Sequence, residues 1–152
     1  MNPLLTKTAA TNSAAVAPLL LRIAFAIVMF PHGAQLLAGW FGGYGYTASM
    51  GFFSSMGLPG IIGFLIIFLE FFGSLFILFG LFTRWFALAC LILVLGMIIM
   101  VHIHVGFFMN WYGNIKGEGF EYHILMISML LSILIAGGGK ASLDSILFNS
   151  KK

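Results

Sequence analysis

Charged residues are scarce in this sequence. The chain has 152 residues, of which seven are Lys or Arg and four are Asp or Glu, so charged residues make up 7%. A soluble domain of this length could not cover its surface with so few charges. Hydrophobic residues make up 61%, and the mean hydropathy is +1.10. The composition therefore excludes an ordinary soluble domain and predicts an integral membrane protein with one compact domain.

Cysteine pairs and clustered positive charge are missing as well. Cys90 is the only cysteine, so the chain can form no internal disulfide and cannot carry out dithiol–disulfide chemistry alone. The formal net charge is +3, but the basic residues are scattered and form no aromatic-interleaved patch, so no nucleic-acid partner is expected. We expect Cys90 to be a small residue of the core.

Four apolar runs predict an all-α membrane protein with the architecture of a four-transmembrane-helix bundle. They cover about residues 16–38, 61–82, 85–108 and 121–136, and a helix needs about 20 residues to cross the hydrocarbon core. We expect a transmembrane domain over 16–138, a flexible segment 1–15 before it and a short segment 139–152 after it. In the last segment, Ser142 is typical of a helix N-cap. The uncharged, aromatic 39–60 connection predicts a segment at the membrane interface.

The basic residues predict how the bundle is oriented. One side of it would hold Lys7, Arg22, Arg84, Lys140, Lys151 and Lys152, and the other side would hold Lys116. Because Lys and Arg accumulate on the cytoplasmic side, both termini are expected to be cytoplasmic. Arg22 and Arg84 are interpreted as anchors at that side, and the side chain of Arg22 is expected to snorkel to the lipid headgroups.

Glu70 lies in the middle of the second apolar run, "GFLIIFLEFFGSLFILFG". A charged side chain at the bilayer centre costs about 2.5–3.5 kcal/mol on insertion scales, so a carboxyl group there usually has a function. At 100° per residue, Glu70 shares a helix face with Gly63, Gly73 and Gly80, and small residues at such spacing allow close helix contact. This face is therefore expected to point into the bundle. The alternative is a structural role, in which Glu70 is protonated, or paired with His32 or Arg22, and locks the helices together.

The histidines fall at a similar depth. His32 lies at about the level of Glu70, His102 and His104 end the third run, and His123 begins the fourth. The side chains of His32, Glu70, His102 and His123 can therefore converge in the outer half of the bundle. Because His102 and His104 are about 200° apart on a helix, they cannot both point inward unless the helix unwinds. Helical phase alone does not choose between them.

A histidine beside a buried carboxyl group suits several kinds of site. Two histidines could hold a haem iron, and His with Glu could hold a metal ion, but no dedicated metal motif such as H-E-x-x-H is present. A quinone needs one or two hydrogen-bond donors in an apolar slot, and His32 near Glu70 meets that need and can pass protons. Quinone is thus favoured over haem or metal. His104 and His123 also fit a plainer interpretation, as interfacial residues bonded to the loops.

Several stretches resemble the DoxX family. They are "LLLRIAFAIVMFPHGAQLLAG", "GLPG" leading into "FLEFFGSLFILFGLFTR", "VHIHVGFF", "GFEYHILM" and "GGGKASLDSIL", in order over about residues 19 to 147. The residues that match the family pattern are Arg22, His32, Glu70, Arg84, His102, Glu121, Tyr122 and Asp144. The resemblance selects His102 over His104, and it leaves His104 and His123 outside the pattern. It implies a four-helix protein of the bacterial inner membrane that is linked to oxidoreduction.

These observations lead to one preferred interpretation and its alternatives. We interpret Glu70 and His32 as the catalytic pair of a quinone-linked subunit of a membrane oxidoreductase complex. The expected cofactor-binding residues are His102, Arg22, Glu121 and Tyr122, with no metal site. Since the chain lacks a flavin fold, iron–sulfur cysteines and a thiol pair, a partner protein would supply electrons. Membrane lipid and a partner protein or further copies of the chain are the expected partners. The alternatives are a non-enzymatic scaffold that binds lipid or a partner, and passage of a small solute or protons.

Overall fold

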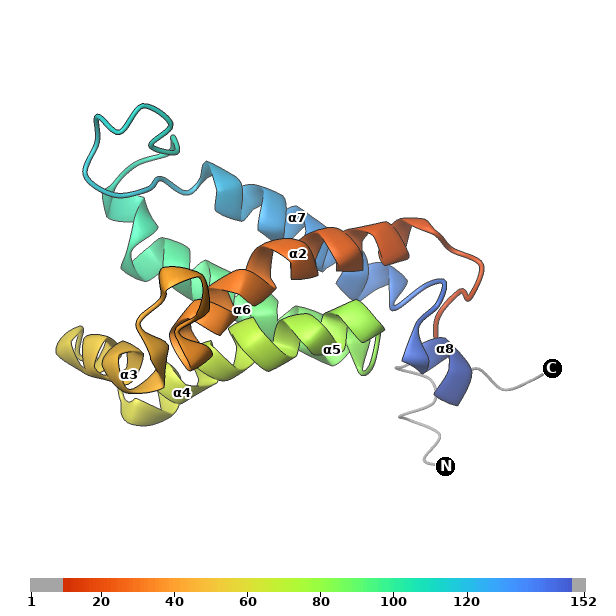
Figure 1. The fold of residues 1–152 in the computed structure, drawn as a ribbon. Coiled ribbons are helices and arrows are strands. Elements are labelled where there is room, and N and C mark those ends of the chain that lie inside the picture. Colours follow the sequence, from red (N-terminus) through yellow and green to blue (C-terminus); the bar gives the residue numbers. More distant parts are fainter. Residues whose placement is uncertain (1–9, 149–152) are drawn as a thin grey trace.

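All regular elements of the described residues, 10–148, are helices in a computed structural model (Figure 1). Their order along the chain is α2 (Ala17–Ala38), η1 (Trp40–Gly42), α3 (Gly45–Ser55), α4 (Gly60–Phe68), η2 (Leu69–Gly73), α5 (Ser74–Phe79), α6 (Thr83–Met100), η3 (His102–His104), α7 (Glu121–Ala136) and α8 (Leu143–Leu147). The prediction of an all-α protein is confirmed for this part of the chain.

Among residues 10–148, three helical segments are long and apolar enough to cross a membrane, namely Ala17–Ala38, Gly60–Phe79 and Thr83–His104. α7 is also apolar but has only 16 residues. By helix length and composition, this is therefore a multi-pass membrane protein. The third segment is shorter than its predicted range, 85–108. Its α-helix ends at Met100 and one 3-10 turn follows, and Gly106 then adopts a φ of 117° that no helix accommodates.

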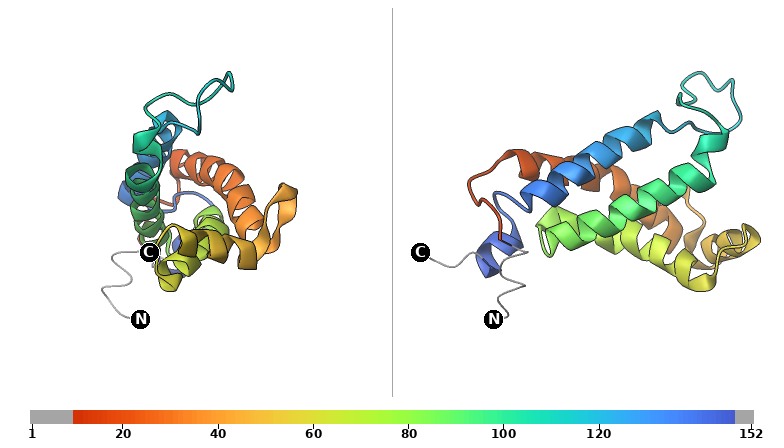
Figure 2. Two further views of the ribbon diagram at one scale, coloured as in Figure 1. Left: turned by 90° about the vertical axis from the view of Figure 1, so that its left-hand side faces the viewer. Right: turned by 180° about the vertical axis from the view of Figure 1, so that it is seen from behind.

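The long helices pack around one apolar core. α6 packs along α7, and α2 packs against η2, α5 and α7 (Figure 2). The centre of the core holds fully buried side chains such as Phe25, Ile77, Val94 and Leu130. Cys90 is part of this cluster with no exposed surface, which confirms its predicted place in the core.

The bundle has two distinct ends (Figure 1). The terminal end carries residues 10–16, 80–83 and 137–148, and the loop end carries residues 39–59 and 101–120. The predicted orientation, with the terminal end cytoplasmic, stays a prediction, and Lys7, Lys151 and Lys152 lie outside the described residues. The predicted flexible segment 1–15 falls mainly on residues 1–9, which also lie outside them. In the 39–60 connection, α3 forms, and both Tyr44, which directly precedes it, and Tyr46 in its first turn are exposed.

At the terminal end, α8 is fastened to the turn that precedes α6. Ser142 caps α8 by accepting a hydrogen bond from the Ser145 amide at 3.2 Å, which confirms the predicted N-cap. The carboxylate of Asp144 accepts bonds from the amides of Phe82 at 2.7 Å and Thr83 at 2.9 Å, and from the Thr83 hydroxyl at 2.6 Å. These bonds satisfy amides at the start of α6 that have no partner within the helix.

Arg22 is fully buried at the terminal end, so the prediction that it snorkels to the headgroups is wrong. Its Nη2 donates to the carbonyl oxygens of Lys140 at 3.0 Å and Ala141 at 3.4 Å. The reason is that the 137–142 segment folds back over the start of α2, where Lys140 N also donates to Ala15 O at 2.8 Å. The nearby carboxylate of Asp144 stabilises the guanidinium charge.

At the same end of the bundle, Arg84 binds the C-terminus of α7. Its Nε donates to Leu134 O and its Nη2 donates to Ile135 O, each at 3.0 Å. These are carbonyl groups of the last turn of α7, which lack partners within the helix and carry partial negative charge. Arg84 therefore joins the start of α6 to the end of α7.

Candidate functional site

Glu70 lies in a π-helical turn, η2, that interrupts the second membrane-spanning segment. Such turns contain one extra residue and are frequent at functional sites. The backbone of α2 touches this turn at Gly33, where an added Cβ would overlap Phe71 N and the Glu70 carbonyl carbon. Because Gly33 permits this contact, the neighbouring His32 is held beside the turn that carries Glu70.

The Glu70 side chain points into the bundle and is only 4% exposed. Gly63, Gly73 and Gly80 of the same predicted face are buried too, which confirms that this face is turned inward. Within residues 10–148, the Glu70 carboxyl group forms no ion pair. The pairing with Arg22 considered above is wrong, because Arg22 is bonded to Lys140 and Ala141 at the terminal end.

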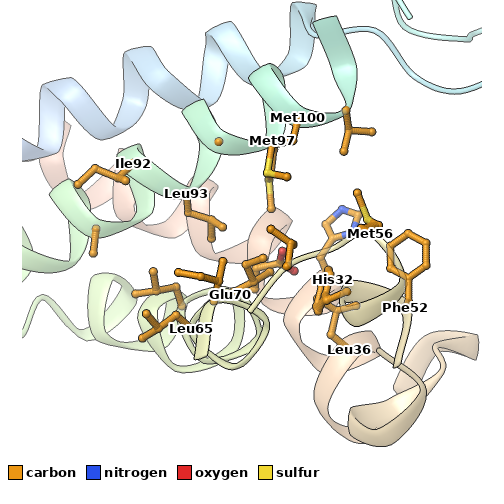
Figure 3. Close-up of a pocket in the computed structure, with 18 of the residues that line it drawn as sticks. His32, Leu36, Phe52, Met56, Leu65, Glu70, Ile92, Leu93, Met97 and Met100 are labelled. Carbon is orange, nitrogen blue, oxygen red and sulfur yellow. The ribbon is translucent and has the colours of Figure 1, made fainter. Parts of the chain in front are cut away.

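One side of Glu70 faces a cavity of about 520 Å³, here called the apolar cavity (Figure 3). It lies between α2, α3 and α4 on one side and α6 on the other, and its only polar side chains are those of His32, Gln35 and Glu70. Leu65 of α4 and Ile92 of α6 line it and are also 40% and 62% exposed. The cavity thus reaches the outer surface of the bundle between α4 and α6, where lipid would surround the protein.

Another side of Glu70 faces a second cavity of about 420 Å³, here called the polar cavity. It extends toward the 105–120 loop, and its polar side chains are His32, Glu70, His102, Glu118, Tyr122 and His123. His32, Glu70 and Met97 line both cavities. Figure 3 shows His32 and Glu70 directed toward a common space from α2 and η2. These two residues therefore stand at the junction of an apolar and a polar space.

Two histidines meet in the polar cavity. His102 Nδ1 lies 2.8 Å from the carbonyl oxygen of Glu118, and because a carbonyl only accepts, this nitrogen carries the hydrogen. The rings of His102 and His123 are 4.0 Å apart between centroids. His123 is 6% exposed, and its Nδ1 is buried without a hydrogen-bond partner among the described residues. The helix unwinds at His102–His104, and the exposed His104 lines neither cavity.

The remaining predicted site residues divide between the two ends. Tyr122 lines the polar cavity. The Glu121 carboxylate instead accepts bonds from Met109 N at 3.2 Å and Trp111 Nε1 at 3.0 Å, so it fastens the loop. Arg22 lies at the terminal end and lines neither cavity. The sequence analysis did not predict Glu118 as a site residue. Its position, in the loop shortly before α7, is the signal that could have pointed to it.

Across residues 10–148, no three His, Cys, Asp or Glu side chains come together in a way that could hold a metal ion. The donors at the junction are thus a carboxyl group and an imidazole, with a phenol in the polar cavity.

The fold and the site define a multi-pass helical membrane protein in which a buried acid, Glu70, and an exposed histidine, His32, line two adjoining cavities. The DoxX profile matches residues 17–103, and the chain belongs to the DoxX family. It is 31% identical over 137 residues to "Putative oxidoreductase CatD" of Bacillus subtilis (strain 168), covering 90% of this chain and 91% of that protein. No solved structure matches significantly. The resemblance inferred from the motifs is therefore confirmed.

Proposed function

We propose that this protein is a quinone-linked subunit of an oxidoreductase complex in the bacterial inner membrane. The observation that carries the proposal is the position of Glu70 and His32, at the junction of an apolar cavity open to the side and a polar cavity. The relative's name, an oxidoreductase, supports a redox role. Electrons would come from a partner protein, because this chain has one cysteine and cannot use a thiol pair.

The residues at the junction fit a quinone. Its carbonyl oxygens need hydrogen-bond donors, which His32, Tyr122 and a protonated Glu70 can provide. The apolar cavity offers walls of Leu65, Ile92 and similar side chains for a hydrocarbon tail. Its volume of about 520 Å³ lies within the range of about 300–1,000 Å³ that is usual for ligand sites. A bound quinone would supply the ability to accept two electrons and two protons.

The chain's own part in this chemistry is to hold the head group and to move protons. An unpaired carboxyl group in an apolar setting is stabilised in its neutral form, because burying an isolated charge is costly. Glu70 can therefore donate a hydrogen bond to one carbonyl oxygen and then transfer its proton there. His32, which lines both cavities, can orient the ring from α2 and return a proton to Glu70.

The first experiment measures binding of an isoprenoid quinone to the protein in lipid nanodiscs. Glu70→Leu keeps about the size of the side chain but removes the hydrogen-bond donor that would hold a quinone carbonyl oxygen. We expect it to weaken binding at least tenfold without lowering the temperature of thermal unfolding. Glu121→Leu is the matched control, because its carboxylate lies outside both cavities, and it should bind quinone as the wild type does.

A second pair of variants tests the apolar cavity. Gly96 lines it, and an added Cβ there would meet no atom within 4 Å, so Gly96→Leu fills the cavity without a backbone clash. It should weaken binding of a tailed quinone but not of a tail-less one. Gly51→Leu is the control, since Gly51 is equally open but lies outside the cavity. If all variants bind quinone equally well, the proposed site is wrong. If the wild type binds no quinone and Glu70→Leu impairs assembly with a partner protein, the scaffold function is favoured instead.

A further inference from the structure

We propose that the polar cavity is the proton route of Glu70, and that it leads through His123 and His102 to the aqueous phase at the loop end. The need for protons at Glu70 rests on the proposed function, but the route itself can be tested without a quinone. It assigns proton transfer to His123 and Glu118, neither of which belongs to the residue pattern that links the chain to its family.

The route is one-sided because the proton-carrying groups lie on one side of Glu70. The proton-carrying side chains of the polar cavity come from four elements: His32 from α2, His102 from η3, Glu118 from the loop, and Tyr122 and His123 from α7. α6 lines the cavity with Val94 and Met97 only. Toward the terminal end, the core presents fully buried apolar side chains such as Phe25 and Ile77. It also holds the thiol of Cys90, which is fully buried and lies against the Leu69 carbonyl oxygen, with 3.9 Å between sulfur and oxygen. The Ser74 hydroxyl, one turn away, is engaged with Phe71 O of its own helix at 2.7 Å.

The middle of the route is formed by His102 and His123, whose rings lie 4.0 Å apart between centroids and are tilted by 41°. The bond to Glu118 O fixes the hydrogen of His102 on Nδ1, which leaves Nε2 of the neutral ring to accept a proton. His123 Nδ1 is buried and has no partner among the described residues, although buried polar groups are normally hydrogen-bonded. A water molecule in the polar cavity would satisfy it, because the space of about 420 Å³ is roomy and has several polar side chains.

The outer end of the route opens to solvent. Glu118 is exposed, and its Oε2 accepts a bond from the amide of Asn110 at 2.7 Å, which holds the carboxylate in place. Its carbonyl oxygen binds His102, so the same residue joins the surface to the first histidine. A proton can therefore enter at Glu118, pass by the His102–His123 pair and reach Glu70 by way of water, Tyr122 or His32.

The test is hydrogen–deuterium exchange of the Glu70 carboxyl group, followed by infrared spectroscopy after transfer of the reconstituted protein to D₂O. The carbonyl band that is absent in Glu70→Gln identifies the group. We expect the double variant His102→Gln/His123→Gln to slow exchange of this band at least tenfold. His104→Gln is the matched control, because His104 lies on the same 3-10 turn but outside the cavity, and it should exchange as the wild type does.

The single variant His102→Gln keeps the test informative if the double variant fails to fold. The Gln amide can still donate to Glu118 O, so the loop should stay in place, and exchange should slow about threefold or more. Exchange at wild-type rates in folded His102 and His123 variants would overturn the proposal, as would a Glu70 carboxyl group that is ionised throughout. Slowed exchange in a protein that binds no quinone would instead overturn the proposed function and leave the route standing.

Discussion

The terminal end of the bundle and the surroundings of Glu70 use polar side chains in opposite ways. At the terminal end, the side chains of Arg22, Arg84 and Asp144 are bonded to backbone groups of neighbouring elements. Around Glu70, the carboxyl group and the imidazole of His32 face cavities instead. The charged residues that mark this family in the sequence therefore serve two purposes. Some hold helix ends together, and others line an internal space.

Arg22 and Glu70 show the difference most directly. Both lie in membrane-spanning helices and both are buried, at 0% and 4% exposure. Nη2 of Arg22 has two carbonyl partners and Asp144 supplies a nearby negative charge, although Nε and Nη1 have no partner among the described residues. Glu70, by contrast, forms no ion pair within residues 10–148. A buried charge with fixed partners is a structural element, and a buried acid that faces a cavity is free to exchange its proton.

Asp144→Ala should produce the largest loss of stability. It removes three hydrogen bonds at the start of α6 and leaves the buried Arg22 without its nearby negative charge. Since a hydrogen bond to a charged group contributes about 1.5–3 kcal/mol net, the loss of these bonds should cost about 3 kcal/mol or more. Thermal or denaturant unfolding in mild detergent measures this loss. Glu70→Gln should lower the free energy of unfolding by less than about 1 kcal/mol, the net value of one hydrogen bond. Equal losses of stability in the two variants would show that Asp144 and Glu70 do not differ in their structural role.

Gly33→Ala should have an intermediate effect. Its Cβ would overlap the backbone of Glu70 and Phe71, so α2 must move away from η2, and such overpacking costs about 1–3 kcal/mol. The movement also separates His32 from Glu70, so quinone binding should weaken together with stability. Gly51→Ala is the control, because nothing lies near its added Cβ, and it should unfold no earlier than the wild type. If Gly33→Ala changes neither stability nor quinone binding, the backbones of α2 and η2 are not in contact.

Glu121→Gln should have the smallest effect. Its carboxylate accepts bonds from Met109 N and Trp111 Nε1, and loss of such charge-assisted bonds at a partly exposed site costs about 1 kcal/mol. The change should be local, so amide exchange at Met109 should rise while the unfolding midpoint shifts little. A large drop in quinone affinity would instead return Glu121 to the ligand site predicted from sequence.

Much of this arrangement follows from local sequence patterns. The apolar runs predicted the helices, helical phase predicted the inward face of Glu70, and Ser142 was predicted as an N-cap. Two decisive features depend on residues far apart in the chain. The π-turn at Glu70 lies against Gly33, and the burial of Arg22 depends on the segment around Lys140 folding back over α2. Periodicity within one helix contains no information about such contacts.

The burial of Cys90 means that the wild-type protein should not react with a thiol-labelling reagent. The thiol has no exposed surface, and its sulfur lies 3.9 Å from the carbonyl oxygen of Leu69 at the start of the π-turn. A maleimide that cannot cross membranes should therefore leave the folded protein unmodified. A cysteine placed at Tyr112, which is 90% exposed at the loop end, or at the exposed Ser13 of the terminal end would then be the single reactive site. In intact cells, these two variants would report which end of the bundle faces outward.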